Sequence, residues 1–251
     1  MERSHRGRSF KDCRRRRVYI RRLARKLEFS SALLKAIVTE KTATLWHMAF
    51  SENEYAAHYA VSILAMHADE VCRGLAAHCP YVAPEIQKKL CYDPSLEVRR
   101  ALAGNAHSIP VIRYILLMEE DSAVRIAAIY NSSATKIEII FGIYDPSEEV
   151  REVAVGATLR FEPLSPKEYK TLGEDTSWRV RRKVLELSTS SLELVNSFAN
   201  DPQAEVREAL GRSKLATLET LLILRDDPVP QVKGYARMNM KERFPQGSSE
   251  I

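Results

Sequence analysis

A hydrophobic residue followed by a basic residue recurs along the chain at a nearly constant spacing. The dipeptides are Val98-Arg99, Val124-Arg125, Val150-Arg151, Val180-Arg181 and Val206-Arg207, with Val232-Lys233 as a conservative sixth. All the steps between them are equal except the one from Val150 to Val180, which is longer. A fixed period of about 26 residues is typical of solenoid proteins, in which one small unit is stacked many times.

Other positions keep the same phase as these valines. Toward the N-terminus, Val71 and Leu45 take the valine position in two degenerate units, which gives eight units in all. Five positions before the valine an acidic residue stands in every unit except that of Val71, which has Met66 there. The acids are Glu40, Asp93, Glu119, Asp145, Asp175, Asp201 and Asp227, and proline follows four of them, at Pro94, Pro146, Pro202 and Pro228.

Each of these columns has a physical interpretation as part of a helix pair. Asp-Pro predicts a helix start, because a carboxylate caps free N–H groups and proline is tolerated at the first helical position. The valine and the residues three and four positions later share one helix face, which we expect to be buried. A second apolar run follows in each unit, and its expected N-caps are Ser108, Thr135, Ser190 and Thr217. The sequence therefore predicts an all-α fold, a right-handed α-solenoid of about eight 26-residue helical repeats without strands.

The repeat columns resemble the leucine-rich repeat variant family, whose units read roughly Leu-x-x-Asp-Pro-x-x-x-Val-Arg-x-x-Ala/Val-Ala-x-Asn. Residues 90–105 of this chain fit that pattern almost position by position, and Asn131 recurs at the position of Asn105. The resemblance covers about residues 40–245. It implies a HEAT- or armadillo-like solenoid in which the second helix of each unit is short and often 3₁₀, and it says little about function.

The acidic and basic columns lie six residues apart, about 240° around a helix, so they are too far apart to pair on one helix. We expect instead that an acid in one unit meets the basic residue of the next, which would form a charge ladder along the stack. The alternative is that the basic column binds a ligand, but paired charges bind phosphate poorly. The predicted ladder contains Asp93, Arg99, Arg125, Asp145, Arg151, Asp175, Arg181, Asp201, Arg207, Asp227 and Lys233.

One unit is four residues longer than the others. Its extra residues fall within residues 159–168, where Pro163 and Pro166 predict an extended loop before the next helix. Insertions in solenoids can lie on a binding face, but a loop without function is the simpler interpretation. We expect Trp178, just after this insertion, to belong to the core.

Charge is unevenly distributed over the 251 residues, whose formal net charge is +5. Residues 1–26 contain twelve basic and two acidic residues, so this segment alone carries +10 and the rest of the chain −5. Such asymmetry indicates an interaction tail. The predicted domains are a basic arm at residues 1–26, a repeat domain at residues 27–245 and a disordered tail at residues 246–251.

The basic arm can form an amphipathic helix in which Ile20, Leu23 and Leu27 share one face. Nucleic-acid phosphates, an anionic membrane surface or an acidic protein would each suit it, and an organellar targeting segment is a further interpretation. The simplest alternative is that the three apolar residues cap the first repeat while the arginines are solvated. The candidate binding residues are Arg14, Arg15, Arg16, Arg17, Arg21, Arg22, Arg25 and Lys26.

All four cysteines and all six histidines lie at or before His107. Cys72, Cys79 and Cys91 are weak metal candidates, because they lack the close Cys-x-x-Cys spacing of zinc and iron–sulfur sites. Some members of the resembling family carry an iron–sulfur cluster, but for Cys72 and Cys91 the favoured interpretation is that they are small buried hydrophobes. We therefore expect no metal and no cofactor.

The sequence favours a binding protein over an enzyme. It contains no phosphate-binding glycine loop, no Gly-x-Ser-x-Gly and no His-Glu-x-x-His. We expect a non-enzymatic scaffold whose surface binds a protein partner, without a small-molecule substrate or a membrane span. The first alternative is a nucleic-acid-binding protein that uses the arm to contact RNA or DNA, and a HEAT-like DNA glycosylase or an iron–sulfur protein is less favoured. The reduced cysteines and the absence of a secretory signal favour the cytoplasm.

Overall fold

The structure is a computed structural model that describes residues 40–161, 164–185, 187 and 192–245. Within these residues the chain forms fifteen α-helices and one 3₁₀ helix, and it contains no strand. The prediction of an all-α fold is therefore confirmed. None of the helices in this part of the chain is both long and apolar enough to cross a bilayer.

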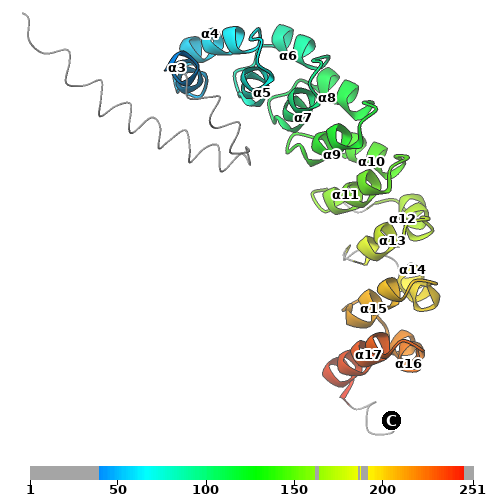
Figure 1. Cartoon of the computed structure of the whole chain (residues 1–251). Helices are drawn as coiled ribbons and strands as arrows, with labels where there is room; N and C mark the ends of the chain where they lie inside the picture. The colour runs from blue at the N-terminus through cyan, green and yellow to red at the C-terminus, as the bar shows by residue number, and fades with distance from the viewer. Residues whose placement is uncertain (1–39, 162–163, 186, 188–191, 246–251) are drawn as a thin grey trace, which may run out of the picture. The chain divides into compact units, whose positions relative to one another are not determined.

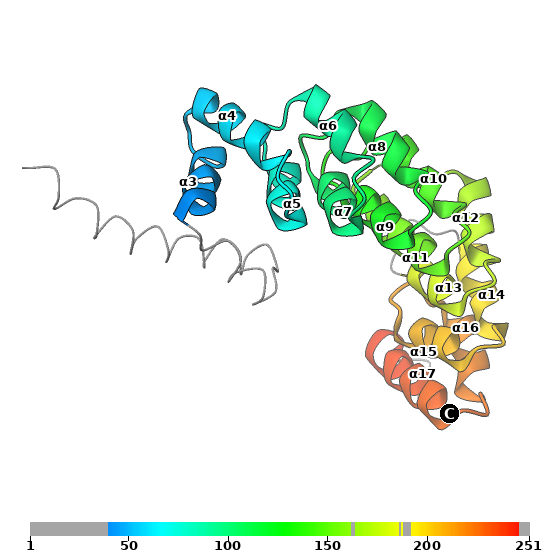
Figure 2. The same cartoon turned by 45° about the horizontal axis from the view of Figure 1, so that its top comes forward.

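Within each of the two compact units described below, consecutive helices alternate between two rows (Figures 1 and 2). The first row consists of α3 (Glu40–Ala49), α5 (Glu70–His78), α7 (Leu96–Gly104), α9 (Ser122–Tyr130), α11 (Glu148–Thr158), α13 (Trp178–Val184), α15 (Ala204–Arg212) and α17 (Pro230–Arg243). The second row consists of α4 (Glu54–Leu64), α6 (Pro84–Leu90), α8 (Pro110–Leu117), α10 (Lys136–Ile143), α12 (Pro166–Gly173), α14 (Leu192–Ser197) with η1 (Phe198–Asn200), and α16 (Leu218–Arg225).

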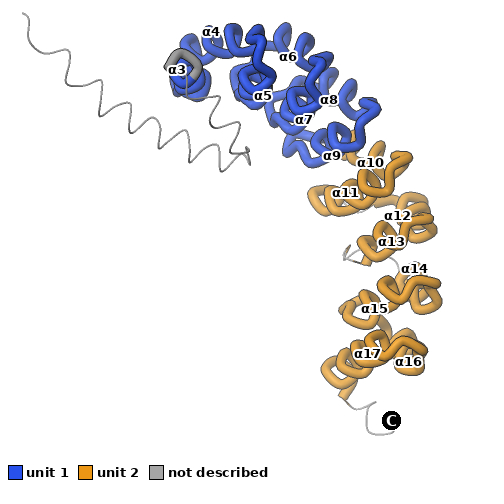
Figure 3. Tube along the Cα trace, in the orientation of Figure 1, with its two compact units in different colours: residues 1–134 blue, residues 135–251 orange. Residues whose placement is uncertain are grey.

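The described helices fall into two compact units that divide between Ala134 and Thr135 (Figure 3). In unit 1, α5 packs against α7 and α7 against α9, while α4, α6 and α8 contact their neighbours in the first row. In unit 2, α11, α13, α15 and α17 pack in the same sequential order. Contacts between helices one repeat apart are the packing of an α-solenoid, in which each repeat buries its apolar face against the next.

The eight predicted units correspond to the eight first-row helices, although the valine position was wrong in the first two. All six valines from Val98 to Val232 are fully buried. In α3 and α5, however, Leu45 and Val71 are only half-buried, and the buried residues are Trp46 and Cys72. Trp46, Cys72 and Val98 are evenly spaced, so the period of the repeat continues without a break into the first two units. We misplaced the register because neither unit has a valine at the buried position.

The predicted N-cap position at the aspartate of Asp-Pro was also wrong by two residues. Helix α7 begins after its N-cap Ser95, so Asp93 and Pro94 lie outside the helix. The Asp93 carboxylate accepts a hydrogen bond from the Ser95 amide at 2.9 Å and closes a turn that leads into the helix. Of the four expected N-caps, Thr135 and Thr217 have this role. Ser108 does not, because its hydroxyl donates to the Leu102 carbonyl, and Ser190 lies outside the described residues.

Close packing between first-row helices depends on one position that faces the next repeat. Within the units, at or just after the end of the helix, this position holds a buried small or apolar residue in five repeats: Ala77, Ala103, Val155, Leu185 and Gly211. A Cβ on Gly211 would lie 3.4 Å from the Ala236 amide nitrogen, which shows how closely α15 and α17 approach. In α17 the same position holds Arg237, which is exposed.

Candidate interaction surface

Charged pairs between consecutive first-row helices form a charge ladder, which we define as Arg73–Asp93, Arg99–Glu119, Arg151–Asp175, Arg181–Asp201 and Arg207–Asp227. Four of the pairs are bidentate. In the Arg181 pair, for example, Nε and Nη2 donate to the two Asp201 carboxylate oxygens at 2.6 and 2.8 Å. These side chains are largely buried, and bidentate geometry between a guanidinium and a carboxylate is the strongest form of such a pair.

The remaining nitrogen of each arginine bonds to the backbone of its own repeat. Nη1 of Arg181 donates to the carbonyl oxygen of Asp175 at 2.7 Å and to that of Thr176 at 3.2 Å. Arg151 makes the equivalent bonds to Asp145 and Pro146. Each arginine therefore binds both the backbone that leads into its own helix and the carboxylate of the following repeat. With Nε, Nη1 and Nη2 all used inside the stack, the guanidinium groups of the four bidentate pairs have little capacity left for a phosphate.

The direction of the ladder is opposite to the one we expected. The basic residue of one repeat binds the acid of the following repeat, whereas the prediction paired an acid with the basic residue of the following repeat. The reason is geometric, because Nη1 already donates to the backbone carbonyl groups of its own acid and of the residue after it. Nε and Nη2 then point toward the following helix entry.

The pairing in the ladder favours the charged forms of both the arginines and the aspartates. The hydrogen bond with its carboxylate partner raises the pKa of Arg73, and likewise that of Arg151, Arg181 and Arg207. Burial acts to raise the pKa of Asp93, but hydrogen bonds from Arg73 and the Ser95 amide outweigh it and lower that pKa below its usual range. The Asp227 pKa is lowered in the same way, by Arg207 and the Val229 amide against the effect of burial.

Three predicted ladder residues remain. Arg125 donates through Nη1 to the carbonyl oxygens of Glu119 and Glu120, both at 2.8 Å. Asp145 accepts from the Ser147 amide at 2.8 Å. Lys233 is half-buried in α17, and its charge helps to lower the pKa of Asp227.

Arg73 belongs to the ladder, and the sequence analysis missed it. It precedes Arg99 by the same interval that separates Arg99 from Arg125, but the misplaced register at Val71 hid this relation. Its Nε and Nη2 donate to Asp93 at 2.7 and 2.9 Å. The acidic position of its own repeat is held by His67, whose Nδ1 accepts from the Asp69 amide at 3.0 Å. His67 thus makes the turn that the aspartates make elsewhere, with an imidazole in place of a carboxylate.

Buried asparagines form a second set of contacts between repeats. Asn105 Nδ2 donates to the carbonyl oxygens of Ala77 and Cys79 at 2.7 and 2.9 Å. Asn131 makes the equivalent bonds to Ala103 and Asn105 at 2.7 and 2.8 Å. Each side-chain amide donates to two carbonyl groups at the end of the preceding first-row helix, where intrahelical partners are missing. In unit 2, Asn239 does the same for Gly211 and Ser213.

The three cysteines proposed as weak metal candidates are structural in this arrangement. Cys79 occupies the asparagine position, and its Sγ donates to the Ala49 carbonyl at 2.8 Å. Cys91 Sγ donates to the Lys88 carbonyl. Burial raises the pKa of Cys72 and of Cys79 to about 11, which keeps both thiols protonated at neutral pH. Among the described residues no group of three or more His, Cys, Asp or Glu side chains gathers as metal ligands would.

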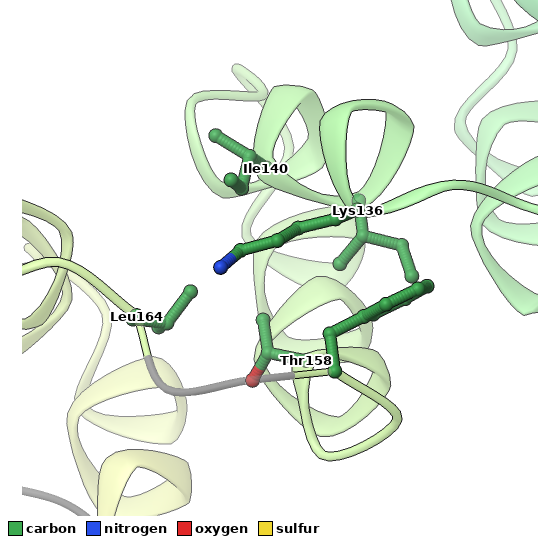
Figure 4. Close-up of a pocket in the computed structure, with 6 residues that line it drawn as sticks. Lys136, Ile140, Thr158 and Leu164 are labelled. Carbon is green, nitrogen blue, oxygen red and sulfur yellow. The ribbon is translucent and has the colours of Figure 1, made fainter.

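A small hollow in unit 2 lies beside the loop that contains the insertion (Figure 4). Its lining is Lys136, Ile139, Ile140, Thr158, Phe161 and Leu164, and these side chains leave no room for a water molecule. It is therefore a packing gap between α10, α11 and the loop before α12. Trp178, which we expected in the core, is half-buried at the start of α13, where the guanidinium of Arg182 lies 5.3 Å from its ring.

One exposed position per repeat changes its chemistry along the chain. It directly precedes the ladder acid and lies at the end of each second-row helix. We call these residues the exposed column: Met66, Tyr92, Met118, Tyr144, Glu174, Asn200 and Asp226. All seven are exposed, so the core does not require an apolar residue at this position. The first four are nevertheless large and apolar, and the last three are polar. The sequence analysis missed this column and registered Met66 only as a break among the acids.

The rest of the second-row surface also becomes more polar along the chain, but the change comes after α10 and not at the unit boundary, because α10 of unit 2 exposes Ile137, Phe141 and Tyr144. Unit 1 exposes Val111, Tyr114 and Met118 along α8, with fractional exposures of 55%, 48% and 57%, and Tyr92 at 72%. The positions equivalent to Val111 in α12, α14 and α16 of unit 2 are Lys167, Glu193 and Glu219, all exposed. Clustered exposed apolar side chains mark interaction sites, and aromatic residues and methionine are enriched there. We define the apolar surface of unit 1 as Tyr92, Val111, Tyr114 and Met118.

The basic residues proposed for partner binding, from Arg14 to Lys26, lie outside the described residues. So does Cys13, the fourth cysteine.

Comparison with known proteins shows the fold. No protein-family model matches the chain, and no curated protein matches it by sequence. Among solved structures, it is similar to the X-ray structure of YibA from Escherichia coli, an α-helical repeat protein of HEAT-like or leucine-rich repeat variant type. The two share 15% sequence identity with a TM-score of 0.51, and the match covers 96% of this chain and 99% of that one. The protein is thus an α-helical repeat protein that resembles YibA.

Proposed function

We propose that this protein is a non-enzymatic helical-repeat scaffold that binds a protein partner through the apolar surface of unit 1. The observation that carries the proposal is the exposed column. The same solvent-facing position holds Tyr92 and Met118 in unit 1 and Tyr144 in the first repeat of unit 2, but Glu174, Asn200 and Asp226 in the later repeats of unit 2. Since neither folding nor solubility calls for an apolar side chain there, burial by another molecule is the best account of it.

Chemistry and rigidity both support a protein partner. Tyrosine and methionine offer large contact areas, and methionine adapts its shape to an irregular apolar surface. The charge ladder and the buried asparagines fix the spacing between repeats, so Tyr92 and Met118 are presented at a set separation. A partner that spans two repeats would gain from this preorganisation.

Quantitative affinity purification tests the proposal. We expect a protein partner captured by the wild-type chain to be depleted at least about tenfold by the double variant Tyr92→Glu/Met118→Glu, because charges would then be buried in an apolar contact. The matched control is Asn200→Glu, which places the same residue at the same position in unit 2. Lysates are treated with nuclease, so that nucleic acid cannot bridge the proteins. Equal capture by all three proteins would contradict the proposal.

The charge of residues 1–26 favours a second candidate function, nucleic-acid binding. Twelve basic side chains would contact phosphates with little sequence preference. If about half of them engage at once, the log–log dependence of affinity on salt should have a slope of about −4 to −6. Anisotropy titrations at two salt concentrations, with full-length protein and with a variant lacking residues 1–26, measure this. Equal affinity of the two proteins would show that nucleic acid binds to the repeat surface and not to residues 1–26.

A further inference from the structure

Helix α4 is apolar on two opposite faces. One face, with Ala57, Ala60, Val61 and Leu64, is buried in unit 1. The other face, which we call the α4 face, consists of Tyr55, Tyr59, Ile63 and, just after the helix, Met66. These residues recur at intervals of four, four and three positions, so they follow one side of the helix. Tyr55 is 90% and Tyr59 62% exposed. Exposed Glu54, His58 and Ser62 lie between the two faces on one flank, so the α4 face is an exposed apolar stripe, which is a mark of an interaction site.

Acidic residues stand at both ends of the α4 face. Glu52 and Glu54 precede Tyr55, and Asp69 and Glu70 follow Met66. Residues 42–72 contain these four acids and no lysine or arginine. Lys41 directly precedes this stretch and Arg73, which is held by Asp93, directly follows it. On α6, Lys89 Nζ contacts Met66 Sδ at 2.6 Å. The sequence around Tyr55, Tyr59 and Ile63 is therefore apolar with two acids on each side, while Lys89 contacts the face at Met66.

The basic arm has the complementary composition. Residues 14–27 contain eight basic residues and no acid. Ile20, Leu23 and Leu27 recur at intervals of three and four positions, which is again the spacing of one helix face. An apolar stripe with arginines on both sides matches an apolar stripe with acids at both ends. Arginine also contacts tyrosine rings favourably through its planar cation.

The connection between the two segments is short. Residues 28–39 lead from the arm to Glu40, where α3 begins, and α3 packs directly against α4. Twelve extended residues span up to about 40 Å, whereas a helix of 11 residues such as α4 is only about 16 Å long. The arm can therefore reach any part of the α4 face within the same molecule, and such a tether raises its effective concentration there.

From this complementarity we propose that residues 14–27 of the chain dock on the α4 face of the same molecule, with Ile20, Leu23 and Leu27 against Tyr55, Tyr59 and Ile63, and the arginines toward the acids. The contact covers the apolar side of α4 and places the eight positive charges of residues 14–27 beside the acids at its ends. It also makes the arm a regulated element, because a polyanion that binds the arginines has to release it from α4. The proposal does not depend on the protein partner of the apolar surface of unit 1.

Hydrogen–deuterium exchange of the full-length protein, freed of nucleic acid, tests the contact. We expect the amides of residues 14–27 to exchange at least about tenfold more slowly in the wild type than in Tyr55→Ser/Tyr59→Ser, because docking has to open before exchange. The control is Tyr130→Ser, which removes a tyrosine of similar exposure from α9 in the first row. Circular dichroism confirms that each variant is folded. A second variant, Glu52→Lys/Glu54→Lys, should also accelerate exchange of the arm by weakening its charge attraction.

Three outcomes would overturn the proposal. Fast exchange of residues 14–27 in the wild type would mean that the arm is not docked. Protection that survives both α4 double variants would place the arm elsewhere. Protection that increases with protein concentration would assign the α4 face to the arm of a second copy. Loss of protection in both α4 variants, together with its retention in Tyr130→Ser, supports docking within one molecule.

Discussion

The second-row helices α6 and α8 of unit 1 and α12, α14 and α16 of unit 2 perform the same structural task with different surfaces. Both sets cover a first row held by the same arginine–carboxylate pairs, and both turn one residue per repeat toward solvent at the end of the helix. In unit 1 that residue is Tyr92 or Met118, and in the last three repeats of unit 2 it is Glu174, Asn200 or Asp226. The fold therefore does not determine this choice.

This difference separates residues that build the stack from residues that use it. A position that is buried in every repeat, such as that of Val98 and Val206, reports only on packing. A position that is exposed in every repeat but apolar only in some of them indicates where the surface binds another molecule. The comparison can be tested by changing residues of each kind in both units.

The largest effect on stability should come from the ladder. Arg151→Ala would leave the Asp175 carboxylate with the Ser177 amide but without its cation, and would remove a donor from the carbonyl groups of Asp145 and Pro146, at a cost of about 3 kcal/mol. Urea unfolding measures this cost. The control Lys170→Ala removes an exposed i,i+4 pair with Glu174, for which we expect less than about 0.5 kcal/mol. An unchanged midpoint together with impaired ligand binding would instead make the arginine column a binding site.

The buried asparagines should give the next largest effect. Asn131→Ala removes two hydrogen bonds to the carbonyl groups of Ala103 and Asn105 inside unit 1, and we expect a loss of about 2 kcal/mol. Asn200→Ala, at an exposed position of unit 2, should change stability by less than about 0.5 kcal/mol. Equal unfolding midpoints of the two variants would show that water replaces the Asn131 amide.

Acid should weaken both units through their ladders. The pKa values of Asp93 and Asp227 are lowered in the folded state, so these carboxylates stabilise the fold fully above the unfolded value of about 4. That stabilisation is lost as the pH falls through the lower folded pKa. Unfolding midpoints between pH 7 and pH 2.5 should therefore decline below about pH 4. Asp93→Asn should show a smaller decline than the wild type, and an identical profile would contradict the assignment.

The smallest effect should come from exchanging residues within the exposed column. Tyr92→Ser in unit 1 and Glu174→Tyr in unit 2 should each change the free energy of unfolding by less than about 0.5 kcal/mol, since both sites are exposed. Thermal unfolding of the two variants checks this. A clear destabilisation by Tyr92→Ser would mean that Tyr92 supports the fold, and the exposed column would then lose its value as a sign of binding.

The sequence alone predicted the repeat well, because the valine and acid columns carry strong physical requirements at a fixed period. It failed where those requirements are met by other residues. Cys72 fills the buried position without being a valine, so Arg73 was missed, and His67 closes a turn without being an acid. Periodicity also could not identify the exposed column. Tyr92 and Met118 recur with the period of the repeat just as core residues do, and only their exposure in the structure separates them from the core.

The replacement of the ladder pair at the first joint has a consequence for how the molecule opens. Where later joints have arginine and a carboxylate, α3 presents His47 and the following repeat presents His67, two imidazoles that cannot form an ion pair with each other. In a stack of repeats, stability is close to a sum of nearest-neighbour couplings, so the weakest coupling opens first. Thermal fraying should therefore start at α3 and spread toward α5. A molecule that binds α4 would therefore stabilise the contact between the repeats of α3 and α5, where unfolding begins.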